Sequence, residues 1–584
     1  MTDLRCHVSD EQGGGSDGAL SFDLTSRPWL PVQLTTGEEQ LLSLQEVFSR
    51  ADEVRRLAGD LPTQDFALTR LLLAILHDAV AGPQDAEAWA ELWEDDAPFA
   101  GVDAYLAEHR SRFDLLHPRA PFFQTGGLHT ASGEVFSLNR MVADVPNGDP
   151  FFTTRFPGVE RLSFAEAARW VVHVQAYDTS GIKTGVVGDP RVKGGKAYPQ
   201  GVAWAGNLGG VLAEGTTLRE TLLLNLVVAA DQQPTDAADR PAWRRPPTGP
   251  GAADDLSARP AGLRDLYTWQ SRRLLLHADA DGVHGVVLTY GDPLAVQNMH
   301  TVEPMTGWRR SQAQEKKLSV PLVYMPREHD PARAAWRGLE ALITPRDPDT
   351  ARRGEPASGL RPGIVDWIAR LQAERILPRG WHIRVRTFGA VYGTQQSVID
   401  EVTSDAVSLS VLLLSDSDRA LGQTAVDAVG DADRAVLALG DLAFDLARAA
   451  GSESESGKQT ARDAAYAALD GPYRLWLDAI GEGDDPQQLR TAWQRTARRI
   501  VARLADHVIS TAGETAWQGR LVSSAKGQTW LNADLADLWF RSRLNKALPL
   551  AADIAAGAVP AQKAPTSDTA GSLDTALSPQ KVTT

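Results

Sequence analysis

One segment of this 584-residue chain combines glycines with basic side chains in a way that suits phosphate binding. The segment DTSGIKTGVVGDPRVKGGKAYPQG, residues 178–201, holds six glycines and four basic residues. A nucleotide-binding P-loop needs G-x-x-x-x-G-K-[ST], because backbone N–H groups must wrap the phosphates and a hydroxyl must reach Mg²⁺. The nearest match, Gly188 to Lys196, has the wrong spacing and is followed by Ala197 instead of a hydroxyl residue. A nucleotide site is therefore not expected here.

Two His-Asp pairs offer a second kind of chemistry. His77-Asp78 and His329-Asp330 resemble the pair of metal-dependent HD phosphohydrolases, which need further His and Asp ligands to hold one or two metal ions. His77 lies in an apolar segment, where a histidine is usually a core residue. The second pair precedes a proline and predicts a turn or a helix start. An HD-type phosphohydrolase or nuclease is kept as the alternative function.

Other catalytic patterns are missing from the sequence or lie outside the expected context. No H-E-x-x-H occurs, and the one G-x-S-x-G match, at residues 14–18, lies in the polar N-terminal segment instead of between a strand and a helix. Cys6 is the single cysteine, which excludes an internal disulfide and a cysteine-ligated zinc site. We therefore expect no catalytic residue, no metal site and no cofactor.

Charge and hydropathy restrict the class of protein further. The net charge of −16 argues against a protein that coats nucleic acid without sequence preference, although local basic loops remain compatible with it. No run of about 18 apolar residues occurs, so no transmembrane helix is expected. The first residues form no apolar signal core, and we therefore expect a cytoplasmic protein.

The length of the chain and its mixture of helical and β-like segments predict an α+β fold with more than one domain. Residues 1–20 and 551–584 have compositions that predict disordered tails. Residues 21–404 mix apolar helical segments with short β-like runs, which predicts an irregular mixed N-terminal body. Residues 405–550 carry apolar residues at helical spacing and predict a C-terminal four-helix bundle.

Four segments give more specific expectations. Residues 67–80 and 164–177 predict buried helices. Residues 217–229 fit either a strand or a short buried helix. Apolar residues within 407–414 recur at helical spacing and predict the beginning of the bundle.

Several segments in a fixed order resemble the CasA family, the large subunits of type I-E CRISPR surveillance complexes (Cascade). The matching segments include FDLTSRPWLPV (22–32), FDLLHPRAPFFQT (113–125), GGKAYPQGVAWAGNLGG (194–210) and EPMTGWRRSQ (303–312). The resemblance covers roughly residues 20–550. It implies a non-catalytic subunit that joins other Cascade subunits and a CRISPR RNA, and inspects double-stranded DNA for the short motif beside the target (PAM). It also implies that this subunit helps open the duplex for R-loop formation and recruits a helicase-nuclease.

The resemblance implies a glycine-rich loop that enters the minor groove of the PAM. By the match of VQAYDTSG and the glycines after it, this glycine loop comprises Ser180, Gly181, Ile182, Lys183, Thr184 and Gly185. A backbone with few bulky side chains suits the narrow minor groove, whose degenerate pattern favours tolerance of several PAM sequences. Lys183, Arg191, Lys193 and Lys196 are expected to contact flanking phosphates.

A wedge that splits the first base pairs beside the PAM is also implied. FGAVYGTQQSVID (388–400) resembles it, with Gln396 as the best match for the glutamine at its tip and Gln395 as the neighbour. Two strand-like flanks predict a β-hairpin. An ordinary polar turn is the alternative interpretation.

Relatives can read the PAM with a lysine on a further loop. The matching stretch here, residues 290–304, has no lysine. Gln297 or Asn298 is expected in this role; if the match is shifted, Arg309, Arg310 or Lys316 takes it.

Two contacts with the assembled complex are implied as well. The loop at 145–158 is expected to dock on guide RNA and neighbouring subunits through Phe151, Phe152 and Thr153, with core packing of one phenylalanine as the alternative. The basic segment 490–503 is expected to face the displaced DNA strand or a partner, or else solvent. A stand-alone scaffold with no nucleic-acid role is a further alternative.

Overall fold

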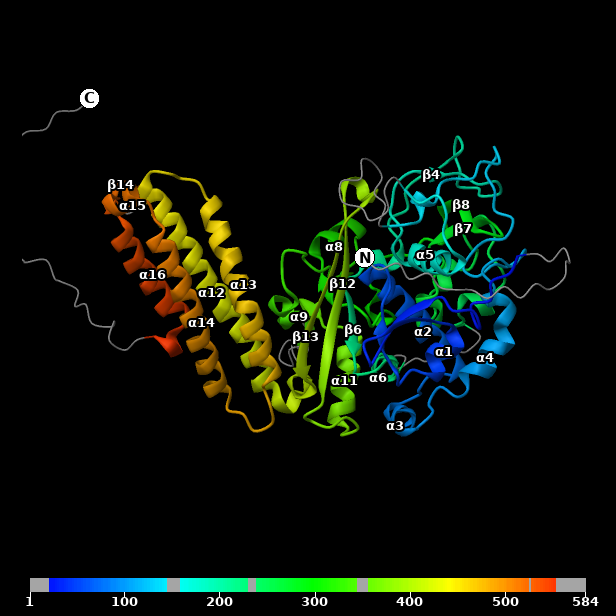
Figure 1. The fold of residues 1–584 in the computed structure, drawn as a ribbon, viewed down its shortest axis with the longest axis horizontal. Coiled ribbons are helices and arrows are strands. Elements are labelled where there is room, and N and C mark those ends of the chain that lie inside the picture. The colour runs from blue at the N-terminus through cyan, green and yellow to red at the C-terminus, as the bar shows by residue number, and fades with distance from the viewer. Residues whose placement is uncertain (1–19, 144–157, 229–237, 344–355, 525–526, 553–584) are drawn as a thin grey trace, which may run out of the picture.

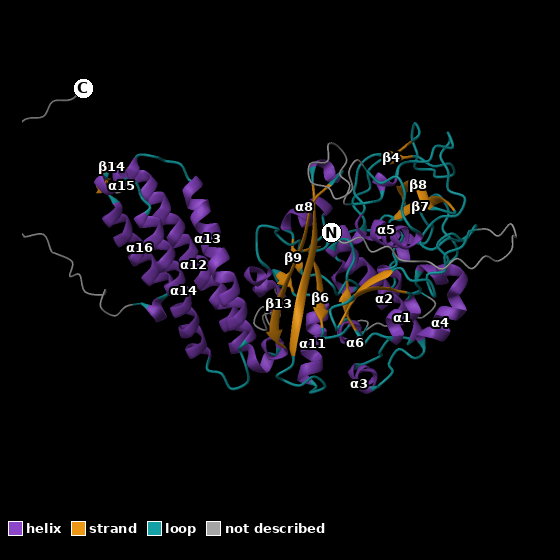
Figure 2. Cartoon of the chain, in the orientation of Figure 1, coloured by secondary structure: helices purple, strands orange, loops and turns teal. Residues whose placement is uncertain are grey.

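The computed structural model describes residues 20–143, 158–228, 238–343, 356–524 and 527–552. They form a mixed body of helices and strands, followed by a set of long helices (Figures 1 and 2). The predicted mixed α+β character is confirmed. Within the described ranges, no helix is long and apolar enough to cross a membrane. The expected docking residues Phe151, Phe152 and Thr153 lie outside the described residues, as do nearly all residues of both expected tails.

The body opens with a small antiparallel sheet next to two buried helices. Strand β1 (Leu30–Leu34) pairs with β2 (Glu39–Leu42) on one side and with β3 (Val54–Leu57) on the other. Helices α2 (Pro62–Ala79) and α5 (Phe164–Tyr177) pack against each other, and both were predicted from the sequence. Helix α2 is buried along almost its whole length, and its polar residues, such as Arg70 and Asp78, are buried together with the apolar ones.

A long antiparallel hairpin lies at the centre of the molecule, on the side of the body that faces the long helices (Figure 2). It consists of β12 (His382–Tyr392) and β13 (Ile399–Ser410), and β6 (Gly210–Glu214) pairs with the other side of β12. The β-hairpin predicted from residues 388–400 is confirmed. A second hairpin joins β7 (Arg272–Asp279) to β8 (Gly282–Tyr290).

The remaining elements of the body are short. They are α1 (Leu44–Ser49), α3 (Ala86–Glu94), α4 (Val102–His109), β4 (Lys183–Thr184), β5 (Lys196–Ala197), α6 (Leu218–Leu224), α7 (Leu263–Tyr267), β9 (Trp308–Arg310), α8 (Gln312–Leu318), β10 (Tyr324–Pro326), α9 (Leu339–Ile343), β11 (Gly359–Leu360) and α11 (Gly363–Ala373). Helix α6 decides between the two expectations for residues 217–229, because it is a short buried helix.

The expected helix over residues 407–414 is wrong. Strand β13 continues to Ser410, and a 3-10 helix follows over Val411–Leu414. Val407 and Leu409 alternate along β13 and face the core, opposite residues of β12. A short apolar run has the same composition in a buried strand and in a buried helix, so its spacing could not separate the two. The first long helix of the C-terminal region begins at Arg419.

The C-terminal region is built on α12 (Arg419–Ala450), which packs against α13 (Ser456–Asp478), α14 (Pro486–Ser510) and α16 (Ala533–Ala547) (Figure 1). Near its far end lie the short helix α15 (Glu514–Gln518) and the hairpin of β14 (Arg520–Ser524) and β15 (Gly527–Leu531).

Aromatic and charged side chains join this region to the body. The Trp336 ring stacks on Tyr473 with ring centroids 4.5 Å apart, and its indole Nε1 donates to Asp470 at 2.9 Å. Arg474 of α13 pairs with Asp405 of β13 at 2.8 Å. The junction therefore fixes α13 directly to the central hairpin.

Candidate nucleic-acid interface

The glycine loop lies against the tip of the β12–β13 hairpin. The backbone N–H of Ser180 donates to the carbonyl oxygen of Gln396 at 2.8 Å. Gly181 has φ +125°, and a Cβ placed on it would lie 3.5 Å from Cβ of Ser397. The glycine loop and the hairpin tip are therefore neighbours in the structure, a contact that the sequence did not predict.

The hairpin tip holds two glutamines in an unusual backbone conformation. Gln395 and Gln396 have φ values of +57° and +55°, and both side chains are exposed. Residues other than glycine adopt this left-handed region rarely, and such strain persists where the surrounding structure imposes it, often at functional sites. Hydrogen bonds across the turn impose it here, since Gln396 N donates to the carbonyl of Gly393 at 2.8 Å.

Contacts on several sides hold the glycine loop in one conformation. The carbonyl of Gly181 accepts from the Tyr290 hydroxyl at 2.5 Å, and Gly185 N donates to the carbonyl of Gly195 at 2.9 Å. A Cβ on Gly185 would lie 2.4 Å from Val192 Cγ1, so this glycine is required by close packing. Of the six loop residues, Ile182 has the most exposed side chain, at 60%.

Two of the residues expected to contact phosphate are paired within the protein. The Lys183 ammonium lies 2.6 Å from Asp178 Oδ2, and its side chain is only 11% exposed. Arg191 pairs with Asp189 at 2.9 Å and also donates to the carbonyls of Tyr290 and Gly291. Both cations therefore have partners within the protein. The sequence shows the nearby aspartates but not which cation each of them binds.

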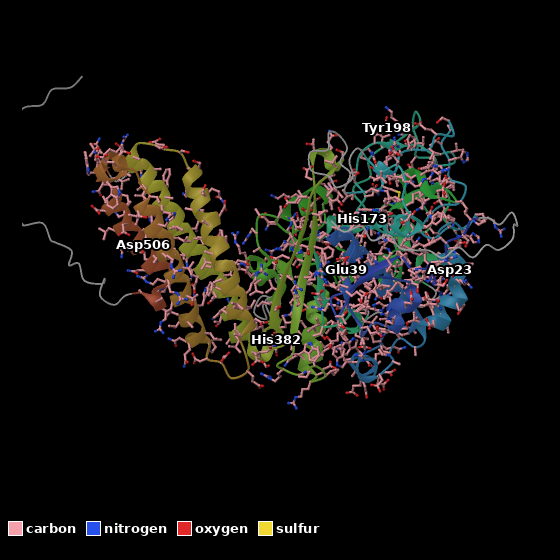
Figure 3. The ribbon with its side chains drawn as sticks, viewed as in Figure 1. Asp23, Glu39, His173, Tyr198, His382 and Asp506 are labelled. Atoms are coloured by element: carbon pink, nitrogen blue, oxygen red, sulfur yellow. The ribbon has the colours of Figure 1, made fainter. Side chains whose placement is uncertain are left out.

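Lys193 and Lys196 are placed differently from these two residues. Each exchanges a backbone hydrogen bond with the other, at 3.0 and 3.1 Å, around the turn Gly194-Gly195 with φ values of +57° and +72°. Glycine is favoured in such two-residue hairpin turns. Both lysines are exposed, so their contact with phosphate stays a prediction. Tyr198, 52% exposed, lies on the same edge of the body (Figure 3).

Asn298 of the expected second PAM-reading loop makes side-chain hydrogen bonds within the protein. Its side-chain amide donates to the carbonyl of Leu322 at 3.1 Å and accepts from the backbone N–H of Tyr324 at 2.8 Å. Asn298 therefore holds strand β10 in place, and its part in reading the PAM stays a prediction. Gln297 is half-buried, and its role stays a prediction.

Arg309, Arg310 and Lys316, the residues expected in this role if the match is shifted, differ in whether they are paired. Arg310 pairs with Glu315 at 2.7 Å. Arg309 and Lys316 are exposed on β9 and α8. Their part in reading the PAM stays a prediction.

His77 and Asp78 form part of the buried core. The Asp78 carboxylate accepts hydrogen bonds from the Tyr105 hydroxyl and, at 2.8 Å each, from Arg244 and Arg264. Burial and the charge of Arg264 lower the pKa of His77 to about 3, so its imidazole is neutral at pH 7. Within the described ranges, no group of three or more His, Cys, Asp and Glu side chains could hold a metal ion.

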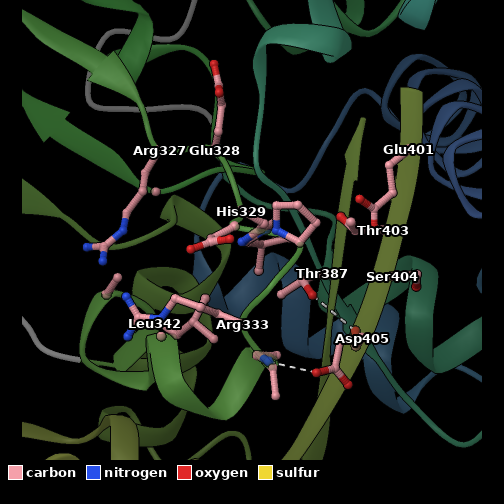
Figure 4. Close-up of a pocket in the computed structure, with 18 of the residues that line it drawn as sticks. Arg327, Glu328, His329, Arg333, Leu342, Thr387, Glu401, Thr403, Ser404 and Asp405 are labelled. Carbon is pink, nitrogen blue, oxygen red and sulfur yellow. Dashed lines mark hydrogen bonds between the residues drawn. The ribbon is translucent and has the colours of Figure 1, made fainter. Parts of the chain in front are cut away.

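The second pair lines a pocket of about 510 Å³ between β13 and the loop that precedes α9 (Figure 4). His329 Nε2 lies 3.0 Å from the carbonyl oxygen of Gly210, and Asp330 accepts from the N–H of Ala332 in a turn. Arg327 and Glu401 are among the lining residues, so the pocket carries both signs of charge. No nucleophile and base are paired among its described lining residues.

Comparison with known proteins assigns the chain to a family. The family model described as CRISPR-associated protein Cse1 (CRISPR_cse1) matches residues 23–504. The chain belongs to the Cse1 family. Its fold is similar to the crystal structure of Thermobifida fusca Cse1, with a TM-score of 0.85 and 57% identity, covering 91% of this chain and 99% of that chain.

Two further relatives of this Cse1-family chain are more distant. The CRISPR-associated protein CasA/Cse1 of Thermus thermophilus is 30% identical over 349 residues, which is 59% of this chain and 64% of that relative's length. A chain of a solved CRISPR RNA-guided surveillance complex shares the fold at 21% identity with a TM-score of 0.60, covering 84% of this chain and 99% of that chain.

The Cse1-family chain uses residues at its glycine loop that the sequence analysis missed. Asp178, Arg272 and Tyr290 contact the loop or one another, and none was expected at the site. Asp178 and its partner Lys183 both lie within the segment 178–201, but Arg272, which also binds Asp178, lies on β7, 94 residues later. Only a three-dimensional structure pairs them.

We expect Asp78→Ala to destabilise the chain without changing any hydrolytic activity. Losing a buried carboxylate that contacts two arginines should lower the free energy of unfolding by about 3 kcal/mol. Thermal denaturation measures this loss, with Asp330→Ala as the control, because Asp330 is exposed and its removal should change stability by less than about 1 kcal/mol. Metal-dependent DNA cleavage by the isolated chain that disappears in Asp78→Ala would revive the HD interpretation.

Proposed function

We propose that the chain is the non-catalytic large subunit of a type I-E CRISPR RNA-guided surveillance complex. It recognises the PAM of double-stranded DNA through the minor groove, helps open the duplex for R-loop formation and recruits a helicase-nuclease. Its partners are the other Cascade subunits, the CRISPR RNA and the target DNA. The observation that carries this proposal is the hydrogen bond between Ser180 N and the Gln396 carbonyl oxygen, which sets a slender loop beside a hairpin tip.

The two parts divide the work of recognition and opening. The glycine loop brings backbone groups and one exposed apolar side chain, Ile182, to a narrow groove whose pattern distinguishes mainly A·T from G·C pairs. Minor-groove proteins commonly insert such apolar side chains between base steps. The exposed amides of Gln395 and Gln396 can donate and accept hydrogen bonds in place of a separated base pair.

The distribution of charge supports contact with DNA in spite of the net charge of −16. Lys196 of β5 pairs with Thr184 of β4, so its exposed ammonium group lies beside the glycine loop. Lys193 lies across the same turn. Two local cations suffice to steer a loop onto the phosphates that flank a groove, while basic surfaces for the guide RNA lie on other subunits.

A comparison of complexes with and without this chain tests the proposal. The complete complex should bind duplex DNA with a PAM at least about tenfold more tightly than duplex DNA without one, which is the discrimination expected from one or two base-pair contacts. The complex that lacks the chain should lose this preference but still bind single-stranded target, since base pairing with the guide supplies that affinity. An unchanged PAM preference without the chain contradicts the proposal and favours the scaffold alternative.

A further inference from the structure

A buried cluster of three charges lies at the base of the glycine loop. Asp178 Oδ2 is 2.6 Å from the Lys183 ammonium and accepts a further hydrogen bond from Arg272 Nε. The side chains of Asp178, Lys183 and Arg272 are 6%, 11% and 3% exposed. Two cations thus share one carboxylate out of contact with bulk water, an arrangement that is stable only while all three groups remain together.

Arg272 also connects the two ends of the segment 178–201. Its Nη2 group donates to the carbonyl oxygens of Asp178, Thr179 and Gly201, each at 3.0 Å. Residues 178–179 begin the segment 178–201 and residue 201 ends it. One guanidinium therefore binds both ends of this segment. The same guanidinium lies over the Tyr290 ring at 4.8 Å, and the Tyr290 hydroxyl donates to the carbonyl of Gly181.

The electrostatics of the cluster act differently on its acid and its base. Burial opposes the charge of Asp178, yet Lys183 and Arg272 together hold the pKa of its carboxyl below the ordinary value. Burial lowers the pKa of Lys183, and the charge of Asp178 opposes this shift.

We propose that Asp178, Lys183 and Arg272 are positioning residues that clasp the glycine loop in the conformation that enters the DNA minor groove. Lys183 acts in this clasp as an internal counter-ion, not as a phosphate ligand. The inference rests on the proposed function. A glycine-rich segment loses much conformational entropy when it becomes ordered. If the clasp orders the loop during folding, DNA binding no longer bears this entropy cost, and the affinity is higher.

The salt dependence of DNA binding separates a clasp from a phosphate contact. Each phosphate contact contributes about 0.9 to the slope of log affinity against log salt on B-DNA. In the complete complex, Lys183→Gln should weaken binding to PAM-containing duplex about tenfold and leave this slope unchanged. Lys196→Gln, the control, should weaken binding and reduce the slope by about 0.9. A reduced slope for Lys183→Gln, or binding equal to that of the unmodified complex, overturns the inference.

Two further variants guard against a folding defect. Lys183→Arg keeps a cation beside Asp178 and should recover most of the affinity that Lys183→Gln loses. Tyr290→Phe removes only the hydroxyl that Gly181 accepts from, and should weaken binding about fivefold with an unchanged slope. Wild-type affinity in Tyr290→Phe together with no recovery in Lys183→Arg contradicts the clasp. If the unmodified complex itself shows no PAM preference, the proposed function fails as well; if it does show one, failure concerns the clasp alone.

Discussion

Replacing Gly181 with leucine is expected to lower the affinity of the complete complex for PAM-containing duplex DNA by at least about 100-fold. Gly181 has φ +125°, where a side chain adds about 1–3 kcal/mol of strain. The new side chain would also point toward Ser397 of the hairpin tip, because a Cβ on Gly181 lies only 3.5 Å from Ser397 Cβ. It would therefore separate the loop from the tip and add bulk where the groove is narrow. Equilibrium binding to duplexes with and without a PAM measures the loss.

The matched control for this variant is Gly37→Leu. Gly37 has φ +92° in the turn between β1 and β2, and nothing lies within 4 Å of a Cβ placed on it. The two variants thus share backbone strain and should have similar thermal midpoints, but Gly37→Leu should leave DNA binding unchanged. Wild-type binding by Gly181→Leu contradicts the placement of the glycine loop, whereas equal losses in both variants assign the effect to general strain.

The sequence predicted those elements whose local pattern agrees with their final environment. Helices α2 and α5 carry long apolar stretches, and the β12–β13 hairpin has alternating strands around a polar turn. The segment 407–414 was misassigned because its apolar residues enter the core from a strand and a 3-10 helix, and their spacing also fits an α-helix.

The candidate site could be predicted less completely than the fold. Resemblance to a family located residues 180–185 and Gln396, but it could not show that Lys183 and Arg191 are bound by Asp178 and Asp189. Arg191 and Asp189 are two residues apart, and a sequence shows that spacing but not the carbonyl oxygens that complete the arginine's surroundings. Both ion pairs are local, but Arg272 and the carbonyl oxygens that bind Arg191 come from distant segments, which no local pattern encodes.

Replacing Gln396 with alanine is expected to slow duplex opening about tenfold while weakening initial PAM binding less than about threefold. The Gln396 side chain is exposed, whereas its backbone carbonyl accepts from Ser180, so alanine removes the amide and keeps the contact with the glycine loop. The lost amide can no longer bond to separated bases, and the first pairs therefore close again more readily. The rate of fluorescence increase from 2-aminopurine at the first base pairs beside the PAM measures opening.

Two controls distinguish strand separation from a damaged hairpin tip. Gln396→Asn retains an amide on a residue that tolerates positive φ, and should open DNA faster than Gln396→Ala. A duplex whose first pairs are mismatched should bring the rate of Gln396→Ala to that of the unmodified complex, because no base pair then has to be separated. If the defect persists on the mismatched duplex, Gln396 acts in initial binding, and the loop and the tip form a single PAM contact. If the mismatch removes the defect, the hydrogen bond between Ser180 and Gln396 joins two parts with separate tasks, and the loop can detect the PAM before the tip divides the strands.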